Sequence, residues 1–422
     1  MKKILVWITC FFAILLVPVV YAKDTVYSLN KYSEEELDYI LKDPTGFVMA
    51  GTYEKEENNV QVLLLKYNEN GNIEWKYSYG ETRKDRLYGL SYLYNEKNDL
   101  SGYLLTIEET TNEERETNPH FLKIDLEGKR IEEEDSLLST DTTITKVIET
   151  SSNEEKAYLV IGTENNKGFM AKYDKELNLL WHRVYDIENT SLIDVIEIEN
   201  VAYYAILSTP VEDDETYHLI KFDLEGNELY KIKEDFEVNQ KPQLEKSKDS
   251  YIIYGITSKV KLKKDETNSY YVMNYNIKDE EVWETIGNTP VDKDSILKIQ
   301  YIDNEYYILS TNLSDKSIEV MRMTQEGFLE EKVKKLKNDY YEIYNFLYDQ
   351  DGLFFVGQIN CPEDDNCDYD ANSLFLACTE DKVIEVEDND SKYILMIAVA
   401  IIILMVGIYF IYKKRKMQEK KH

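Results

Sequence analysis

The sequence of 422 residues is poor in cysteine and histidine, with four of each, and this scarcity narrows the chemistry to be expected. Apart from Cys10 near the N-terminus, the cysteines lie close together at Cys361, Cys367 and Cys378. Their spacing fits no zinc motif, and no histidine lies near them. The sequence also has no G-x-S-x-G, H-E-x-x-H or Walker motif, so no common hydrolase or nucleotide-binding chemistry is indicated.

Proline and glycine are also scarce, with 7 and 16 residues, and no Pro- or Gly-rich linker divides residues 30–388. One closed domain is therefore expected over that range. No long window keeps a helical period near 3.6; only the stretches LKDP (41–44) and KVKKLKN (332–338) look locally helical.

Basic residues are outnumbered by acidic ones, 49 against 81, which gives a formal net charge of −32. Phosphate binding needs a cationic face, so a nucleic-acid partner is not expected. The same charge argues against contact with anionic lipid over the bulk of the chain. It favours solubility and a cationic partner.

A repeat with a period near 50 residues dominates the middle of the chain. Its clearest copy is KYNENGNIEW (66–75), and the residue two places after the lysine marks each copy. These markers are 48 to 57 residues apart: Asn68, Asp125, Asp174, Asp223, Asn276, Thr324 and Thr379. Seven residues after its marker stands Trp75, Trp181 or Trp283 in three copies, so every tryptophan outside the N-terminal apolar run holds one repeat position.

Each repeat contains four short runs rich in Tyr, Ile, Val and Phe, which are typical of β-strands. The N-x-x-G or D-x-x-G segment between the third and fourth runs suits a hairpin turn with glycine at positive φ. Four strands repeated seven times predict an all-β fold, a seven-bladed β-propeller of four-stranded antiparallel blades. Two separate sandwiches are the rival architecture. Residues 23–33 either supply a closing strand or lie outside the sheets.

The frame K-Y-[DN]-x-x-G-x-x-x-W resembles the repeat of bacterial extracellular propellers of the quinoprotein-like superfamily, which is PQQ- and WD40-like. In that superfamily the tryptophan docks one blade on the next, so the resemblance implies a structural role for Trp75, Trp181 and Trp283. Its quinone enzymes use a vicinal disulfide and a cofactor cage. This sequence has no Cys-Cys pair, so the resemblance implies a scaffold and no quinone cofactor.

The two ends of the chain predict a membrane protein. Residues 1–22 have the charged start, apolar run and small-residue end of a signal peptide, with an uncleaved anchor helix as the alternative. Residues 393–412 carry no charge and are long enough to span a bilayer. The basic tail at 413–422 then places the N-terminal domain outside the cell and the tail in the cytoplasm. The predicted order is signal peptide, propeller at 30–388, stalk at 389–392, span and tail.

Candidate sites are few. Asp368, Asp370 and Asn372 open like a calcium loop but lack its glycine and glutamate, so only a weak Ca²⁺ site is indicated. The spacing of Cys361 and Cys367 suits a small disulfide loop, and Cys378 would then remain outside that disulfide. His120 and His218 hold the same repeat place, and a metal site follows only if both face the central channel.

The sequence favours a non-enzymatic cell-surface binding or assembly scaffold that presents variable acidic loops to a protein or peptide partner. The alternative is a surface hydrolase that acts on polysaccharide with carboxylates in the propeller channel. A sensor coupled through the short tail is a third hypothesis. No cofactor beyond weakly bound Ca²⁺ is expected, and the sequence does not decide whether the protein is an enzyme.

Overall fold

The computed structural model describes residues 25–27, 33–56, 59–68, 72–80, 85–110, 117–136, 138–139, 141–211, 214–234, 241–262, 265–287, 291, 297–312, 317–336, 341–349, 352–359 and 373–378. These residues form 28 β-strands and one short 3-10 helix, η1 (Ser152–Glu154). The strands pair into seven four-stranded antiparallel sheets. The protein is an all-β propeller, as the repeat predicts.

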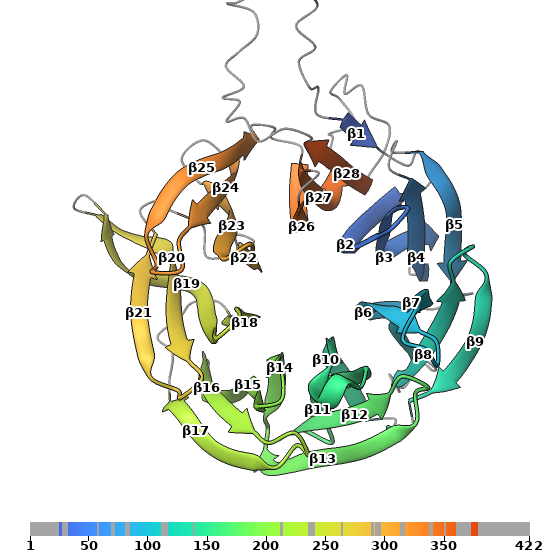
Figure 1. The fold of residues 1–422 in the computed structure, drawn as a ribbon, viewed down its shortest axis with the longest axis horizontal. Helices are drawn as coiled ribbons and strands as arrows, with labels where there is room; N and C mark the ends of the chain where they lie inside the picture. Colours follow the sequence, from blue (N-terminus) through green and yellow to red (C-terminus); the bar gives the residue numbers. More distant parts are fainter. Residues whose placement is uncertain are drawn as a thin grey trace, which may run out of the picture.

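Consecutive strands fill each sheet from the channel outwards (Figure 1). Blade 1 is β2 (Ser33–Asp43), β3 (Gly46–Glu56), β4 (Asn59–Asn68) and β5 (Ile73–Tyr79). Blade 2 is β6 (Asp85–Tyr94), β7 (Leu100–Thr110), β8 (Thr117–Asp125) and β9 (Arg130–Asp135). Blade 3 is β10 (Thr142–Thr150), β11 (Ala157–Glu164), β12 (Lys167–Asp174) and β13 (Leu179–Glu188). Blade 4 is β14 (Ser191–Ile198), β15 (Ala202–Val211), β16 (Asp214–Phe222) and β17 (Glu228–Glu234).

The remaining blades follow the same order. Blade 5 is β18 (Gln243–Lys246), β19 (Ser250–Leu262), β20 (Asp265–Asn276) and β21 (Glu281–Ile286). Blade 6 is β22 (Leu297–Ile302), β23 (Glu305–Asn312), β24 (Ser317–Met323) and β25 (Leu329–Leu336). Blade 7 is β26 (Tyr341–Asp349), β27 (Gly352–Ile359), β28 (Ser373–Cys378) and β1 (Thr25–Tyr27). The two stretches expected to look helical lie largely in strands, because LKD ends β2 and KVKKL ends β25.

The ring closes through a strand from the opposite end of the chain. β1 pairs antiparallel with β28, with Val26 opposite Leu376, and so supplies the outermost strand of blade 7. Figure 1 shows these two strands side by side where the chain enters and leaves the ring. Of the two alternatives for residues 23–33, the closing strand is the one observed.

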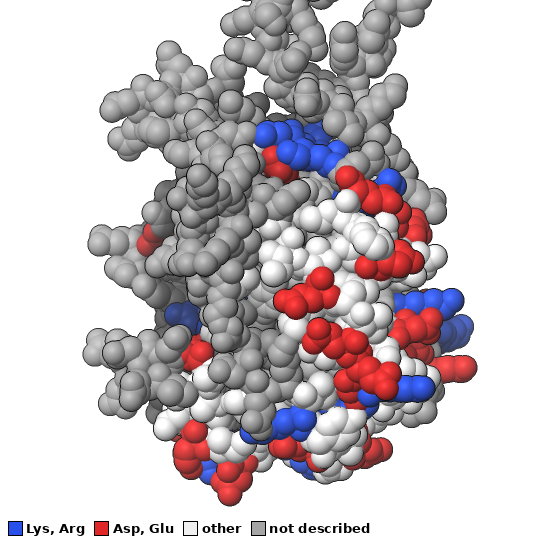
Figure 2. Space-filling model, turned by 90° about the vertical axis from the view of Figure 1, so that its left-hand side faces the viewer, with Lys and Arg blue, Asp and Glu red and all other residues white. Residues whose placement is uncertain are grey.

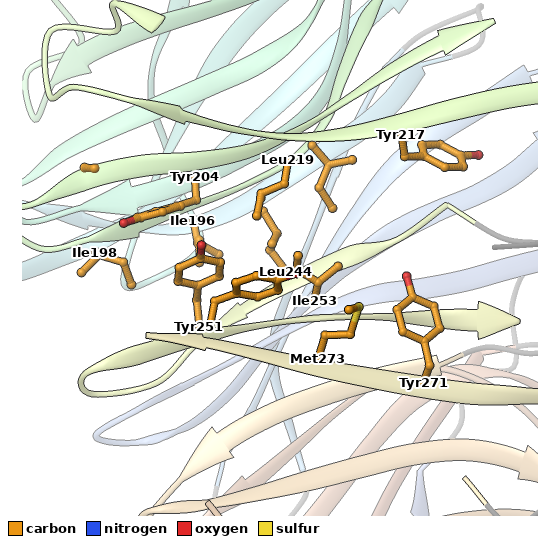
Figure 3. Close-up of a cluster of buried hydrophobic side chains, with 13 residues drawn as sticks. Ile196, Ile198, Tyr204, Tyr217, Leu219, Leu244, Tyr251, Ile253, Tyr271 and Met273 are labelled. Atoms are coloured by element: carbon orange, nitrogen blue, oxygen red, sulfur yellow. The ribbon is translucent and has the colours of Figure 1, made fainter. Parts of the chain in front are cut away.

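Apolar clusters hold neighbouring blades together. Each of the seven clusters joins two blades, and one of them joins blade 7 to blade 1 through Phe354 and Phe47, whose ring centroids are 4.2 Å apart. The cluster between blades 4 and 5 packs Tyr204 against Tyr251, with ring centroids 4.3 Å apart (Figure 3). A continuous ring of such junctions rules out two separate sandwiches.

The repeated motif forms the hairpin between the third and fourth strands of a blade. At Asp125 the carboxylate Oδ1 accepts the N–H groups of Glu127 (3.1 Å) and Lys129 (2.7 Å), and the Asp125 carbonyl accepts that of Gly128 (3.1 Å). This explains the preference for Asp or Asn at the marker, since a short carboxylate or amide can satisfy donors of its own turn.

The fourth-strand tryptophan packs on the turn of the next blade. A methyl group added at Gly226 would lie 2.6 Å from the Trp181 ring, and Trp75 meets Gly128 in the same way. The Trp75 indole N–H also donates to the Leu126 carbonyl at 3.0 Å. The motif glycine therefore receives the ring of the preceding blade besides forming its own turn.

From blade 2 to blade 6 this junction alternates. Blades 3 and 5 follow blades that offer no tryptophan, and their turn residues are larger than glycine: Leu177 (φ 72°) and Asp279 (φ 67°). At Asp279 the Tyr230 hydroxyl of blade 4 donates to the carboxylate across the junction. In these blades the loss of the motif glycine accompanies a second kind of blade contact.

The repeat lysine, two residues before the marker, anchors a second contact between blades. Lys66 is buried, with 1% of its surface exposed, and pairs with Asp43, which also accepts the Tyr103 hydroxyl of blade 2. Burial alone would raise the pKa of Asp43, but hydrogen bonds from Lys66, Tyr103 and Thr45 more than offset it and lower the pKa. The ion pair joins β2 to β4 within blade 1, and the Tyr103 hydroxyl joins Asp43 to blade 2.

The described surface carries acidic and basic side chains around uncharged areas, as Figure 2 shows for one side of the molecule. Within the described ranges, no helix has the length and apolarity needed to cross a membrane. The predicted signal peptide (1–22), stalk (389–392), span (393–412) and tail (413–422) lie outside these ranges.

Candidate functional site

Irregularities in the inner strands set which side chains face the channel. In β2 the register passes from Leu37 opposite Gly51 to Tyr39 opposite Ala50, which leaves Asp38 as an extra, bulged residue. Four other inner strands shift at the same repeat place: β6, β10, β14 and β26. A bulge re-aims a side chain and is frequent beside functional sites.

The bulge explains the glycine that ends the second run of several repeats. A Cβ atom at Gly51 would collide with the Glu36 carbonyl of the bulged strand, and Gly162 and Gly357 face the same obstacle opposite β10 and β26. Only glycine allows so close an approach of two backbones. The bulges, and with them the position of Asp38, are therefore built into the sheet.

A cavity of about 360 Å³ lies between blades 1 and 2, where β2 and β6 begin. We call it the mouth pocket. Its charged and aromatic lining residues are Glu36, Asp38, Glu54, Asp85, Arg86 and Tyr88. Four carboxylates against one guanidinium give it an acidic character, and two of its residues, Asp38 and Tyr88, are bulge residues of adjacent blades.

Asp38 is the carboxyl group of this pocket with the clearest chemical signature. Burial raises its pKa to about 6, the neighbouring Glu36 adds to the rise, and Lys298 opposes it. No other described residue donates a hydrogen bond to the Asp38 carboxylate. A half-buried carboxyl group that titrates near neutrality suits proton transfer.

Most other polar side chains of the channel tie the blades together. The inner-strand side chains bond to backbone groups of the next inner strand, as in Asp194 Oδ2 with the Leu244 N–H (2.7 Å) and Asn345 Nδ2 with the Asp38 carbonyl (3.1 Å). Gln300 Nε2 likewise donates to the Phe346 carbonyl at 2.6 Å. These groups are satisfied within the framework and are not free for a ligand.

Two further charged groups of the channel, Glu245 and Lys298, take part in bonds between blades 5 and 6: Glu245 accepts the Tyr301 N–H, and Lys298 donates to Gln243 Oε1 at 3.0 Å. Burial raises the pKa of Glu245, on β18, to about 7. Burial lowers the pKa of Lys298, on β22, and the nearby ammonium of Lys146 adds to this effect. Both residues are partly exposed.

The candidate residues that the structure describes do not come together in one site. Trp75, Trp181 and Trp283 lie at blade junctions and not in the channel. The calcium candidates Asp368, Asp370 and Asn372, and the cysteines Cys361 and Cys367, lie outside the described residues, and Cys378 is described only as the end of β28. Within the described ranges, no group of three or more His, Cys, Asp or Glu is placed to hold a metal ion.

The idea of a channel metal site at His120 and His218 is wrong. Both lie on third strands, β8 and β16, away from the channel-lining first strands. His120 is 1% exposed and packs against the Tyr79 ring, with centroids 5.4 Å apart. The shared repeat place reflects the framework.

Sequence reasoning missed Asp38, Glu245 and Lys298. Asp38 lies in the first inner run, and Glu245 lies in PQLEKS, the weakest copy of that run. For Asp38 the available signal was a carboxylate at a place where the other bulged strands carry tyrosine, threonine or isoleucine, such as Tyr88 and Thr145. Among so many acidic residues that signal is faint.

The fold and site define the chain as a β-propeller with an acidic pocket at its channel. Residues 205–341 match the sequence model of the lactonase family, described as a 7-bladed beta-propeller. That match covers about a third of the chain. No curated protein matches the sequence.

Solved structures resemble it at low identity. The WD40 domain of Pan2 from Neurospora crassa is 9% identical, with 87% of this chain and 99% of that one covered and a TM-score of 0.47. Sqt1 from Chaetomium thermophilum is 9% identical, with 85% and 100% covered and a TM-score of 0.49. The periplasmic gluconolactonase PpgL of Pseudomonas aeruginosa is 9% identical, with 82% and 100% covered and a TM-score of 0.46.

Proposed function

We propose that this protein is a hydrolase that acts on a polysaccharide at the mouth pocket, with Asp38 as the general acid and Glu36 as the second carboxylate. The observation that carries the proposal is Asp38 itself, a cavity-lining carboxyl group whose pKa is raised to about 6. Such a group is protonated often enough to donate to a leaving oxygen and still returns to its charged form.

Two carboxylates that line one pocket can serve a hydrolysis in which water is the nucleophile, and Glu36 and Asp38 both line the mouth pocket. Inverting glycosidases hold their carboxyl groups roughly 6.5–9.5 Å apart to admit a water molecule. Asp38 would protonate the glycosidic oxygen as its bond to the anomeric carbon breaks. Glu36 would take a proton from the attacking water.

The partial match to the lactonase family supports hydrolysis as the class of reaction. Lactonases open a cyclic ester with water, and a general acid beside a second carboxylate serves that bond as well as a glycosidic one. The size of the pocket, about 360 Å³, suits one or two sugar units.

The test uses the full-length chain and a panel of soluble polysaccharides, with release of reducing ends as the readout. Asp38→Asn should lower kcat about a hundredfold or more, and the wild-type rate should fall as pH rises above about 6, because the acid must be protonated. Asp249→Asn, an exposed change far along the chain, is the matched control. Full activity in Asp38→Asn would refute the proposal.

A second candidate is the non-enzymatic binding scaffold. Its support is the charge of the mouth pocket, where Glu36, Glu54 and Asp85 accompany Asp38 against one arginine. A strongly acidic protein attracts cationic partners from a distance. Salt-sensitive binding of a lysine-rich peptide, without turnover of any polysaccharide, would favour it. A mixed-sequence neutral peptide of equal length is the control.

We further infer a membrane-tethered location, with residues 393–412 as the single span and the propeller outside. The support is the uncharged run followed by Lys413, Lys414, Arg415 and Lys416. Protease added to intact cells should remove the propeller and leave the tail. Protection of the propeller from the protease would contradict this topology.

A further inference from the structure

Both ends of the propeller leave it at one side of the ring. Cys378 ends β28, the third strand of blade 7, and β1 begins at Thr25, opposite Ala377 in the register. Because all blades share one strand order around the channel, the other third strands end at this side too, in the turns of the repeat motif. The turns between first and second strands also lie there, since Lys175 of blade 3 donates to the Asn95 carbonyl in the β6–β7 turn at 3.2 Å. We call this side the turn face.

Exposed apolar residues gather at the turn face. The described part of the chain has thirteen large apolar residues that are exposed, and ten of them lie in these turns or among the first three residues of an outer strand. They are Ile73, Leu126, Ile131, Leu180, Val201, Leu229, Tyr230, Ile277, Val282 and Phe328. The other three, Val184, Ile187 and Ile286, lie further along outer strands. Apolar residues scattered over all sides need no explanation, but a gathering on one side indicates a contact surface.

Three of these residues stand in motif turns of different blades. Leu126 of blade 2, Ile277 of blade 5 and Phe328 of blade 6 are 39%, 42% and 69% exposed. A charged residue lies within two positions of each: Glu127, Lys278 and Glu326. Such turns suit the headgroup layer of a bilayer, where an apolar side chain is received while the neighbouring charge stays hydrated.

The chain on either side of the propeller argues for lipid as the partner of this face. Fourteen residues, 379–392, separate Cys378 from the uncharged run at 393–412, and they span at most about 50 Å when fully extended. A span at 393–412 therefore holds the turn face near the bilayer. An uncleaved anchor at 1–22 would hold the same face, because only residues 23 and 24 separate it from β1. A tethered surface needs little affinity of its own.

The mouth pocket lies at the other end of the channel. Its lining residues Asp85, Arg86 and Tyr88 are at the start of β6, whereas the turn face lies beyond Tyr94, where that strand ends. A strand of this length spans about 30 Å. The pocket and the apolar turns are therefore separated by the height of the propeller.

We propose that the turn face rests on the lipid bilayer, with Leu126, Ile277 and Phe328 among the headgroups, and that the mouth pocket is thereby turned away from the membrane. The inference rests on the membrane-tethered location proposed above and adds which side of the propeller meets the lipid. The contact is apolar and shallow, since a protein of net charge −32 gains nothing from anionic headgroups.

The test places a photoreactive phenylalanine analogue at position 328 of the full-length chain, reconstituted into phosphatidylcholine vesicles that contain a tagged lipid. Position 286 is the matched control, because Ile286 is 46% exposed and ends β21 away from the turn face. Irradiation should give at least about threefold more lipid adduct at 328 than at 286. Equal adducts overturn the proposal. Adducts at 328 between two copies of the chain, in place of lipid, assign the surface to a second copy and also overturn it.

Flotation of the vesicles after an alkaline wash tests the tether separately. A chain that stays with the lipid but gives equal adducts at 328 and 286 refutes the orientation alone. A chain that the wash removes refutes the tethered location and the orientation with it.

A substitution tests whether the turns act together. Phe328→Ser should lower the lipid adducts of an analogue at position 277 at least about twofold, because neighbouring turns of blades 5 and 6 enter the same layer. Ile286→Ser is the control and should leave these adducts unchanged. Both changes are at exposed positions, so the fold should be kept. Unchanged adducts in Phe328→Ser count against the proposal.

Discussion

At the scale of single residues, Gly226 shows why the repeat motif is kept in some copies and lost in others. It closes the turn of blade 4 with φ of 77° and also receives the Trp181 ring of blade 3. Asp279, at the same place in blade 5, tolerates φ of 67° because its neighbour is Tyr230, which bonds to its carboxylate. In blades 4 and 5 the residue at this place thus matches the side chain that the preceding blade presents.

Gly226→Ala should lower the free energy of unfolding by about 2–4 kcal/mol, because it adds positive-φ strain and overlap with Trp181. In a Trp181→Ala background the same change should cost only about 1–2 kcal/mol, the strain alone. Denaturant unfolding of the four proteins of this cycle measures both values. Equal costs in the two backgrounds would show that the ring does not constrain the glycine.

Glu245 predicts a pH dependence of stability. Its pKa rises to about 7 in the folded protein, mainly through burial, from the ordinary value of 4.5 for a glutamate. The folded state therefore holds this proton more tightly, and the stability it contributes is complete below about pH 4.5 and is lost as pH rises through 7. Glu245→Gln should flatten this loss and make the protein about 1–3 kcal/mol more stable at pH 8 than wild type. Unfolding measured at pH 5 and pH 8 tests it. An unchanged slope would contradict the assignment.

The chemical role of Asp38 could not be predicted from the sequence. Asp38 is one of 81 acidic residues, and its environment depends on a bulge and on Lys298, which lies some 260 positions later. By contrast, the role of Trp181 follows from its recurrence at one repeat position. Residues that recur at one repeat position can be recognised as part of the framework. A site made of residues that do not recur leaves no periodic signal in the sequence.

At the scale of elements, the inner strands combine two tasks, since they tie the blades together and line the channel. Asp43 of β2 illustrates the first task, since its carboxylate, 3% exposed, accepts the Tyr103 hydroxyl of blade 2 while it pairs with Lys66 of its own blade. Strand positions were predictable because apolar runs of four to eight residues bounded by Asn, Asp and Gly leave few alternatives. The weakest copy of the inner run, PQLEKS, forms the shortest inner strand, since β18 has only four residues.

Lys66→Met should cost about 3–5 kcal/mol, because it leaves the Asp43 carboxylate buried without its cation. Lys172→Met is the matched control at the same repeat position of blade 3. Lys172 donates only to the neutral Tyr203 hydroxyl, at 2.9 Å, so its loss should cost about 1 kcal/mol. Similar costs for both variants would mean that the ion pair adds little to the tie.

The same pair predicts acid sensitivity. The pKa of Asp43 is lowered in the folded protein, so its contribution to stability is present above the unfolded value of about 3.9 and is lost as pH falls below it. Asp43→Asn should remove this part of the acid loss and lower stability at pH 7. Thermal melts at pH 3 and pH 7 measure both effects. Parallel pH curves for variant and wild type would refute the prediction.

At the scale of the whole molecule, stability depends on closing a ring from blades that each contact only their neighbours. Seven apolar clusters join the seven blades in sequence, and the last junction joins Phe354 of blade 7 to Phe47 of blade 1. The number of repeats made this ring predictable from sequence. The identity of the closing strand was not, because three residues at Thr25–Tyr27 carry no repeat signal.

Deleting residues 24–27 should open the ring at blade 7. Without β1, strand β28 becomes an unpaired edge beside the last junction. We expect the melting temperature to fall by at least about 5 °C and a protease to cut near β28 before the other blades unfold. Deleting residues 417–420 of the basic tail is the matched control and should change neither. An unchanged melting temperature after loss of β1 would show that the blade contacts around Phe47 and Phe354 close the propeller without the terminal strand.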